Sequence, residues 1–203
     1  MLKLGDRAPD FKLTGHDGKT HTLKEFSGKD LILYFYPRNA TPGCTIEACD
    51  FRAHRTAIEK KGATIVGVSP DSVASHTKWQ AKERLGFLLL SDPDHVVADA
   101  YGAWGEKTLY GRKYEGLIRS TFVIDANGRI TRAQYKVSPN GHAAEILAEL
   151  GAAPVAKAAP VAKAAPVAKA APKSAKAPAA PKKAAATKKP APAKKAAPKK
   201  AKP

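Results

Sequence analysis

The chain has 203 residues and carries 35 Lys and Arg against 18 Asp and Glu, which gives a formal net charge of +17 at pH 7. The charge is unevenly distributed, because residues 152–203 contain 14 Lys and no acidic residue, which leaves +3 for residues 1–151. No run of about 18 apolar residues occurs, and this excludes a membrane-spanning helix by length. We therefore predict two parts, a folded domain of residues 1–151 and a basic tail of residues 152–203.

The alternation of hydrophobic patterns in the first part predicts strands that alternate with helices. Two continuous apolar runs, 30–36 and 63–69, are typical of strands buried on both faces, and the segment 44–61 between them contains neither Gly nor Pro. In chain order, the predicted elements are a hairpin of strands 11–13 and 20–23, strand 30–36, helix 44–61, strand 63–69, helix 71–84, strand 87–90, helix 95–101, a hairpin of strands 121–125 and 129–135, and helix 141–150.

This order predicts an α/β domain in which helices flank a mixed sheet, and we expect a thioredoxin-like fold. The strand, helix and strand within 30–69 form a right-handed crossover between parallel strands. Asn127 and Gly128 predict the tight turn of the last hairpin, because both accept positive φ. The helix 44–61 should bury an apolar face with members three and four residues apart, namely Ile46, Cys49, Ala53 and Ala57.

The two cysteines, Cys44 and Cys49, are too few for a disulfide-stapled scaffold. The N-terminus has no apolar stretch typical of a secretory signal, so we expect a cytoplasmic protein, in whose reducing surroundings such a pair is reactive rather than structural. Two buried small apolar residues are the alternative interpretation. Cys44 falls in the first turn of the predicted helix, where unpaired N–H groups and the helix dipole favour an anion such as a thiolate nucleophile.

The spacing of the two cysteines has a geometric consequence. Cys49 lies five residues after Cys44. An intact helix holds their Cα atoms about 8 to 9 Å apart, beyond the roughly 7 Å that a disulfide spans. A bond between them therefore requires the helix to unwind locally.

The residues around Cys44 resemble a known family. Pro37, Thr41 and Cys44 fill the Pro-x-x-x-Thr-x-x-Cys pattern of the peroxiredoxins, and residues 41–49, Thr-Pro-Gly-Cys-Thr-Ile-Glu-Ala-Cys, resemble the peroxiredoxin Q branch, also called bacterioferritin comigratory protein. Further matching motifs occur in order at 5–11, 35–37, 67–71, 90–93, 101–107 and 119–125. The resemblance covers residues 1–150 and excludes the tail.

The resemblance implies a thiol peroxidase that needs no metal or organic cofactor. Cys44 would be the peroxidatic cysteine, which attacks hydrogen peroxide or an alkyl hydroperoxide and becomes a sulfenic acid. Cys49 would be the resolving cysteine, which forms a disulfide with Cys44 within one chain, so we expect a monomer. Thioredoxin or a similar dithiol would reduce that disulfide.

Four other residues receive roles from the same resemblance. Thr41 would hydrogen-bond the thiolate and the peroxide, Arg119 would stabilise the thiolate and the charge on the departing oxygen, and Pro37 would shield the site. Glu47 would orient Arg119, although it fits equally well as an ordinary acidic residue of a first helical turn. Ala40 stands where relatives often have a polar residue, and this change would affect local helix stability.

The tail follows a different pattern. Ala-Ala-Pro-Val-Ala-Lys occurs three times from residue 152, and a Pro every six residues interrupts any helix, so we predict a disordered segment. Its composition resembles the Lys-Ala-Pro arms of linker histones and bacterial histone-like proteins, which implies non-specific binding to nucleic acid and a place on the nucleoid. A solvated extension, or an arm for acidic proteins or membrane surfaces, is the alternative. A second functional hypothesis is a nucleic-acid-binding protein whose domain mainly carries this arm.

Overall fold

The computed structural model describes residues 1–109 and 112–150. The predicted disordered tail and its nucleic-acid binding lie outside the described residues, as does the predicted domain boundary after residue 151. Within the described part, none of the helices has the length and apolar composition needed to cross a membrane.

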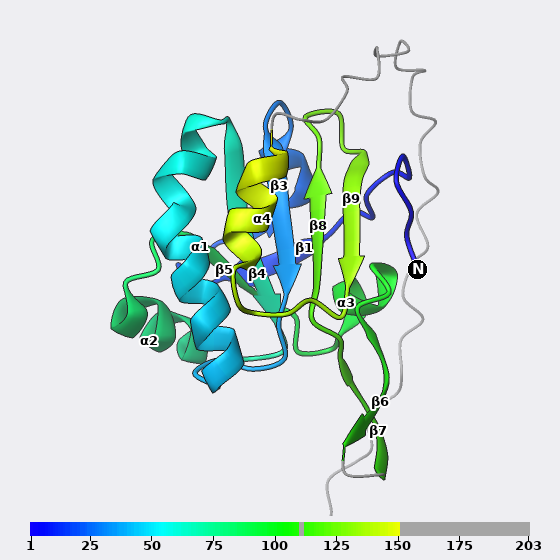
Figure 1. Ribbon diagram of the computed structural model, residues 1–203. Helices are drawn as coiled ribbons and strands as arrows, with labels where there is room; N and C mark the ends of the chain where they lie inside the picture. Colours follow the sequence, from blue (N-terminus) through cyan, green and yellow to red (C-terminus); the bar gives the residue numbers. More distant parts are fainter. Residues whose placement is uncertain (110–111, 151–203) are drawn as a thin grey trace, which may run out of the picture. The chain divides into compact units, whose positions relative to one another are not determined.

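The domain is built on one mixed sheet with the order β2-β1-β5-β4-β3-β8-β9 (Figure 1). The three central strands β3, β4 and β5 are parallel, and the outer strands run antiparallel to their neighbours. The strands are β1 (Lys12–Gly15), β2 (Thr20–Thr22), β3 (Asp30–Phe35), β4 (Ala63–Ser69), β5 (Leu88–Ser91), β8 (Ser120–Ile124) and β9 (Ile130–Tyr135).

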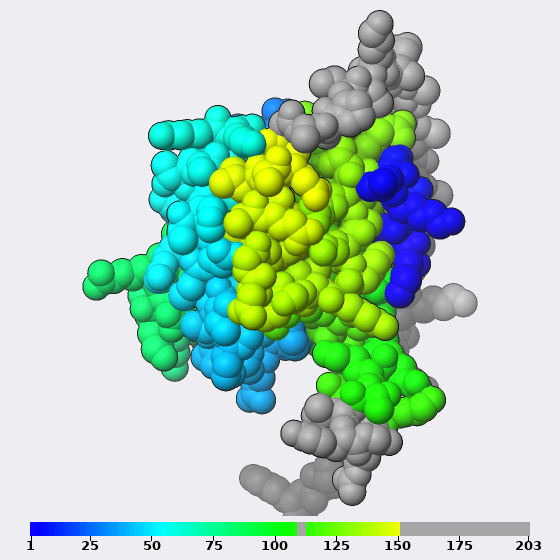
Figure 2. All heavy atoms as spheres, viewed as in Figure 1, coloured from blue at the N-terminus to red at the C-terminus, as the bar shows by residue number. Residues whose placement is uncertain are grey.

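Among the described residues, four α-helices and one short 3-10 helix accompany the sheet. They are the 3-10 helix η1 (Leu23–Phe26) and the α-helices α1 (Pro42–Lys60), α2 (Val73–Glu83), α3 (Val96–Ala100) and α4 (His142–Glu149). Side chains of α1, α2 and α4 share one apolar core, whereas α3 contributes to the core on the other face. Figure 2 shows α4, in yellow, between α1 and the strands β8 and β9. The thioredoxin-like α/β fold is therefore confirmed.

Strand β3 contributes to both apolar cores because successive side chains of a strand point to opposite faces. Ile32 and Tyr34 belong to the core beneath α1, α2 and α4, while Leu33 and Phe35 belong to the core on the side of α3. A strand buried on both faces reads as a continuous apolar run, which is why the sequence predicts β3 and β4 well.

The predicted apolar face of α1 is wrong. The buried residues of this helix are Cys44, Glu47, Ala48, Phe51 and Ile58, whereas Ile46 is 47% exposed. Ala53 and Ala57 are exposed as well, and Cys49 is half-buried. The buried stripe includes a carboxylate, and hydrophobic periodicity counts such a residue as solvent-facing.

Two further features differ from the sequence prediction. A two-stranded ribbon of β6 (Trp104–Leu109) and β7 (Arg112–Leu117), which extends from the sheet in Figure 1, was not predicted because its strands are rich in charged residues and Gly. The turn between β8 and β9 places only Gly128 at positive φ, +78°. Its backbone is held by the Asp125 carboxylate, which accepts from the N–H groups of Asn127 and Arg129 at 2.9 and 2.8 Å.

The close packing of β4 gives a test of the core. A Cβ added to Gly67 would lie 2.8 Å from the ring of Tyr34 and 2.9 Å from Leu89, and both of these side chains are fully buried. We expect Gly67→Ala to lower the free energy of unfolding by about 1–3 kcal/mol through overpacking. Gly105→Ala is the matched control, because its Cβ would make an ordinary 3.5 Å contact with Ile118 and should change stability by less than about 0.5 kcal/mol. Urea unfolding of the reduced protein measures both, and equal stability of the two variants would contradict the expectation.

Candidate active site

Cys44 lies where the central strand β3 gives way to α1. The helix begins after Thr41 with Pro42 at its first position, so Cys44 is its third residue. Proline suits this place because its fixed φ is helical and its missing N–H would be unpaired in any case. Cys44 is 1% exposed, Cys49 is half-buried, and both thiols are free. The first-turn position predicted for Cys44 is confirmed.

Arg119 reaches Cys44 from the connection between β7 and β8. Its Nη2 donates to Cys44 Sγ at 3.2 Å, and its Nη1 donates to Glu47 Oε2. The strand register explains this approach, because Ser120, the residue after Arg119, pairs with Phe35 at the end of β3. The structure therefore brings together three of the predicted site residues, with the guanidinium bridging a thiol and a carboxylate.

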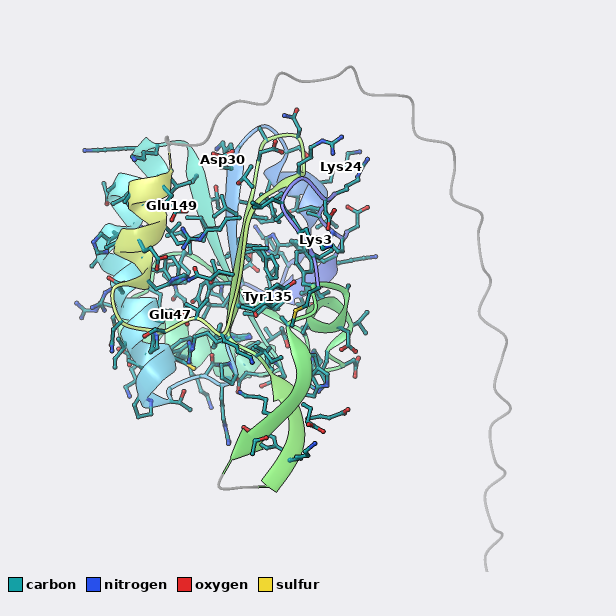
Figure 3. The ribbon with its side chains drawn as sticks, turned by 45° about the vertical axis from the view of Figure 1, so that its right-hand side comes forward. Lys3, Lys24, Asp30, Glu47, Tyr135 and Glu149 are labelled. Atoms are coloured by element: carbon teal, nitrogen blue, oxygen red, sulfur yellow. The ribbon has the colours of Figure 1, made fainter. Side chains whose placement is uncertain are left out.

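Glu47 is the other acidic partner of this arrangement. It lies one turn after Cys44 and is 0% exposed, and in Figure 3 it lies lower in the view than Asp30 and Glu149. Its Oε1 has no hydrogen-bond partner among the described residues. Burial raises the pKa of Glu47 to about 7, because the attraction of Arg119 offsets only part of the lost hydration. Burial by itself lowers the pKa of Arg119, but Glu47 and Cys44 reverse this and raise it.

Thr41 and Pro37 border the same centre. The Thr41 hydroxyl donates to the backbone carbonyl of Arg38 at 3.1 Å, so in this state it binds the loop rather than the thiol. Pro37 is the second residue after β3 and is half-buried. Both residues lie on the short loop that leads from β3 into α1.

The loop between β3 and α1 contains two features that the sequence prediction missed. Ala40 is outside the helix, with φ of +56°, a left-handed conformation that is unfavourable for any residue with a Cβ. Ala40 therefore affects the conformation of the loop, where it is strained, rather than the stability of the helix as expected. The neighbouring Asn39 is buried and bonded to residues of the segment 71–76, which no local pattern indicates.

The far side of α1 is attached to α4. The Asp50 carboxylate accepts from the backbone N–H of Ala143 at 2.8 Å, at the start of α4. The ring of His142 packs edge-on against Phe51 with centroids 5.7 Å apart. Cys49 thus directly precedes the point where α1 is fixed to its neighbour.

Within residues 1–109 and 112–150, no group of three or more His, Cys, Asp or Glu side chains is arranged to hold a metal ion.

Comparison with protein families matches residues 4–133 to the AhpC/TSA family. The chain belongs to this family. Peroxiredoxin Bcp of Bacillus subtilis is 45% identical over 149 residues, which cover 73% of this chain and 95% of the relative. Peroxiredoxin Bcp of Escherichia coli is 43% identical over 129 residues, 64% of this chain and 83% of the relative.

Solved structures agree with this assignment. The bacterioferritin comigratory protein of Xanthomonas campestris is 40% identical and superimposes with a TM-score of 0.69, covering 75% of this chain and 97% of that one. PrxQ of Xylella fastidiosa is 36% identical with a TM-score of 0.71, covering 75% and 97%. The resemblance to the Bcp or peroxiredoxin Q branch is confirmed for the domain, and thiol peroxidase is its enzyme class.

The buried Glu47 of this peroxiredoxin predicts a pH-dependent stability. Its folded-state pKa of about 7 lies above the ordinary 4.5, so the folded state binds the proton more tightly. The resulting stabilisation is complete below about pH 4.5 and is lost as the pH rises through 7. When the pH is raised from 5 to 8, we expect the free energy of unfolding of the original reduced protein to fall by roughly 1–3 kcal/mol more than that of the Glu47→Gln variant.

Urea unfolding at the two pH values measures this difference. The control is Glu106→Gln, which removes a carboxylate paired with Lys113 at 3.0 Å on the exposed ribbon. This control should keep the pH dependence of the original protein, and a Glu47→Gln variant with that same pH dependence would contradict the assignment.

Proposed function

We propose that the protein reduces hydroperoxides through Cys44, and the contact between Arg119 Nη2 and Cys44 Sγ at 3.2 Å is the observation that supports this most directly. The guanidinium stabilises the thiolate by a charge-assisted hydrogen bond. The thiolate attacks the terminal oxygen of the hydroperoxide, the O–O bond breaks, and Cys44 becomes a sulfenic acid. The departing oxygen takes up a proton and leaves as water or as an alcohol.

The same cation serves the departing oxygen. Arg119 already lies against the sulfur, so the departing oxygen of a hydroperoxide bound at that sulfur develops its negative charge within reach of the guanidinium. Thr41 orients the peroxide once its hydroxyl turns from the Arg38 carbonyl toward the site, and Pro37 limits access of water. Glu47 holds Arg119 in place through the second arm of the guanidinium fork.

Cys49 completes the cycle as the resolving cysteine. Its thiol condenses with the sulfenic acid of Cys44, forming a disulfide and releasing water. Because α1 is a continuous helix across both residues in the reduced protein, this step requires its first turns to unwind. A dithiol such as thioredoxin then reduces the disulfide, a cycle suited to the cytoplasm. Since one chain carries both cysteines, a monomer is sufficient.

Alkyl hydroperoxides are proposed as substrates in addition to hydrogen peroxide. The related protein of Xanthomonas campestris is described by its alkyl peroxide reduction activity. Attack on the O–O bond is the same for both substrates, and they differ only in whether water or an alcohol leaves.

The roles of the two cysteines are separable by mutation. Cys44→Ser should abolish peroxide consumption in an assay coupled to thioredoxin, because it removes the nucleophile. Cys49→Ser should consume about one peroxide per chain and then stop, with a sulfenic acid at Cys44 that a dimedone-type probe and mass spectrometry detect. Sustained turnover by Cys44→Ser would refute the assignment.

We further propose that the tail binds nucleic acid without sequence preference. The supporting observation is the charge partition, +14 on residues 152–203 against +3 on the domain. Lysine without arginine or aromatic residues contacts phosphates rather than base edges. We propose nucleic-acid binding in addition to the peroxidase activity and not in its place, because a domain that only carried the tail would need neither Cys44 nor the Arg119 contact. It would place the enzyme on the nucleoid.

The tail hypothesis has its own test. The full chain should bind duplex DNA, whereas a chain ending at Gly151 should not, and both should reduce peroxide at similar rates. If about half of the tail lysines neutralise phosphates, log K against log salt should have a slope of roughly −6. A salt titration of both proteins measures this, and equal binding by the two, or a slope near zero, would contradict the proposal.

A further inference from the structure

A buried polar network lies beside the Cys44 centre, and the proposed reaction does not use it. Its members are Tyr36 directly after β3, Asn39 in the loop before α1, and His76 in α2, all of them buried. The Tyr36 hydroxyl donates to Asn39 Oδ1 at 2.8 Å. The Asn39 side-chain amide lies 3.1 Å from His76 Nδ1 and donates to Ser75 Oγ at 2.9 Å.

The backbone of the loop is fixed by the same group of residues. The N–H of Asn39 donates to Asp71 Oδ2 at 2.7 Å, and Ser69 Oγ donates to the same oxygen at 2.8 Å. Ser91 Oγ donates to the Asp71 carbonyl at 2.7 Å. The loop before Cys44 is therefore bonded to the segment that joins β4 to α2.

These bonds attach the loop directly before its strained residue. Asn39 lies between Pro37 and Thr41, and the next residue, Ala40, has φ of +56°. A residue with a Cβ keeps that conformation only when its surroundings enforce it. The bonds of Asn39 supply this restraint directly before the first turn of α1.

The contacts of His76 Nδ1 favour one state of the ring. The Asn39 amide nitrogen can only donate, so its 3.1 Å contact with Nδ1 favours an accepting Nδ1 with the ring proton on Nε2, whereas Tyr36 Oη, 3.2 Å from the same nitrogen, would accept from the opposite tautomer. Nε2 is buried and has no partner among the described residues. The titratable groups that act on this ring are Tyr36 directly after β3, Asp71 before α2 and His16 after β1. Burial lowers the pKa of His76, in agreement with a neutral ring.

We propose that Asn39 and His76 are positioning residues of the peroxidase: through them, α2 holds residues 37–41 in the strained shape that places Thr41 and Cys44. His76 acts as an acceptor at Nδ1, and Asn39 transmits its position to the loop. This inference rests on the proposed nucleophile role of Cys44, but the state of His76 can be measured independently of it.

The first measurement is the ring protonation of His76 by ¹⁵N NMR on the full reduced chain at pH 7. The original protein should show an unprotonated Nδ1 and a protonated Nε2. Asn39→Asp still accepts from Tyr36 but offers His76 a carboxylate, so Nδ1 should become protonated. Asn127→Asp, the same change at an exposed turn position, should leave His76 unaltered. A protonated Nδ1 in the original protein, or no change in Asn39→Asp, would overturn the proposal.

The second measurement is the rate constant for oxidation of Cys44 by hydrogen peroxide, determined in the Cys49→Ser background. Asn39→Leu removes every bond that the Asn39 side chain makes and should slow oxidation about tenfold or more. Asn39→Asp should keep the rate within about threefold of the original. Its carboxylate still accepts from the Tyr36 hydroxyl, and it accepts from a protonated His76 Nδ1 in place of donating to it. Asn127→Leu is the control for the substitution and should leave the rate unchanged.

These results separate the two proposals. Oxidation of Asn39→Leu at the original rate, in protein whose circular dichroism shows a folded domain, would overturn the positioning role. If Asn39→Leu does not fold, the rate and ring state of Asn39→Asp decide the question. Peroxide consumption by Cys44→Ser would instead refute the proposed nucleophile, while the ring state of His76 would still report on the network.

Discussion

The contact of one guanidinium with two acidic groups is the interaction on which the rest of the site depends. Arg119 donates to Cys44 and to Glu47, and these two acceptors lie one turn apart on the buried face of α1. A buried carboxylate without a partner would strongly destabilise the fold, so Arg119 permits Glu47 to occupy the core. Glu47 in return fixes the guanidinium against the sulfur. In the proposed reaction, stability and chemistry therefore depend on the same cation.

The start of α1 has to satisfy two opposing requirements. It must be ordered enough to present Cys44 to Arg119, and it must unwind if Cys49 is to reach Cys44. The structure places attachments on both sides of the segment concerned. Asn39 fixes the loop before the helix, and Asp50 fixes the helix to α4 just after Cys49. Unwinding between these two points would leave the sheet and the remaining turns of α1 intact.

Much of the fold and part of the site could be predicted from the sequence, because the relevant signals are local. The apolar runs of β3 and β4 and the Gly-free segment between them fixed the crossover, and Pro42 with Cys44 marked the first turn of α1. The apolar face of α1 was misplaced, since Glu47 counts as polar in any periodicity although Arg119 allows its burial. The ribbon of β6 and β7 was missed because its strands carry little apolar signal.

What the sequence determined by itself is therefore the order of the α-helices and of the strands of the main sheet, the position of Cys44 at a helix start and the separation of charge between domain and tail. Only the tertiary structure decided which distant groups meet. Arg119 lies 75 residues from Cys44 and comes beside it because Ser120 pairs with Phe35. Asn39 meets Asp71 and His76 because the parallel strands β3 and β4 end at the same edge of the sheet. Strand pairing sets these contacts, and no local pattern of residues encodes it.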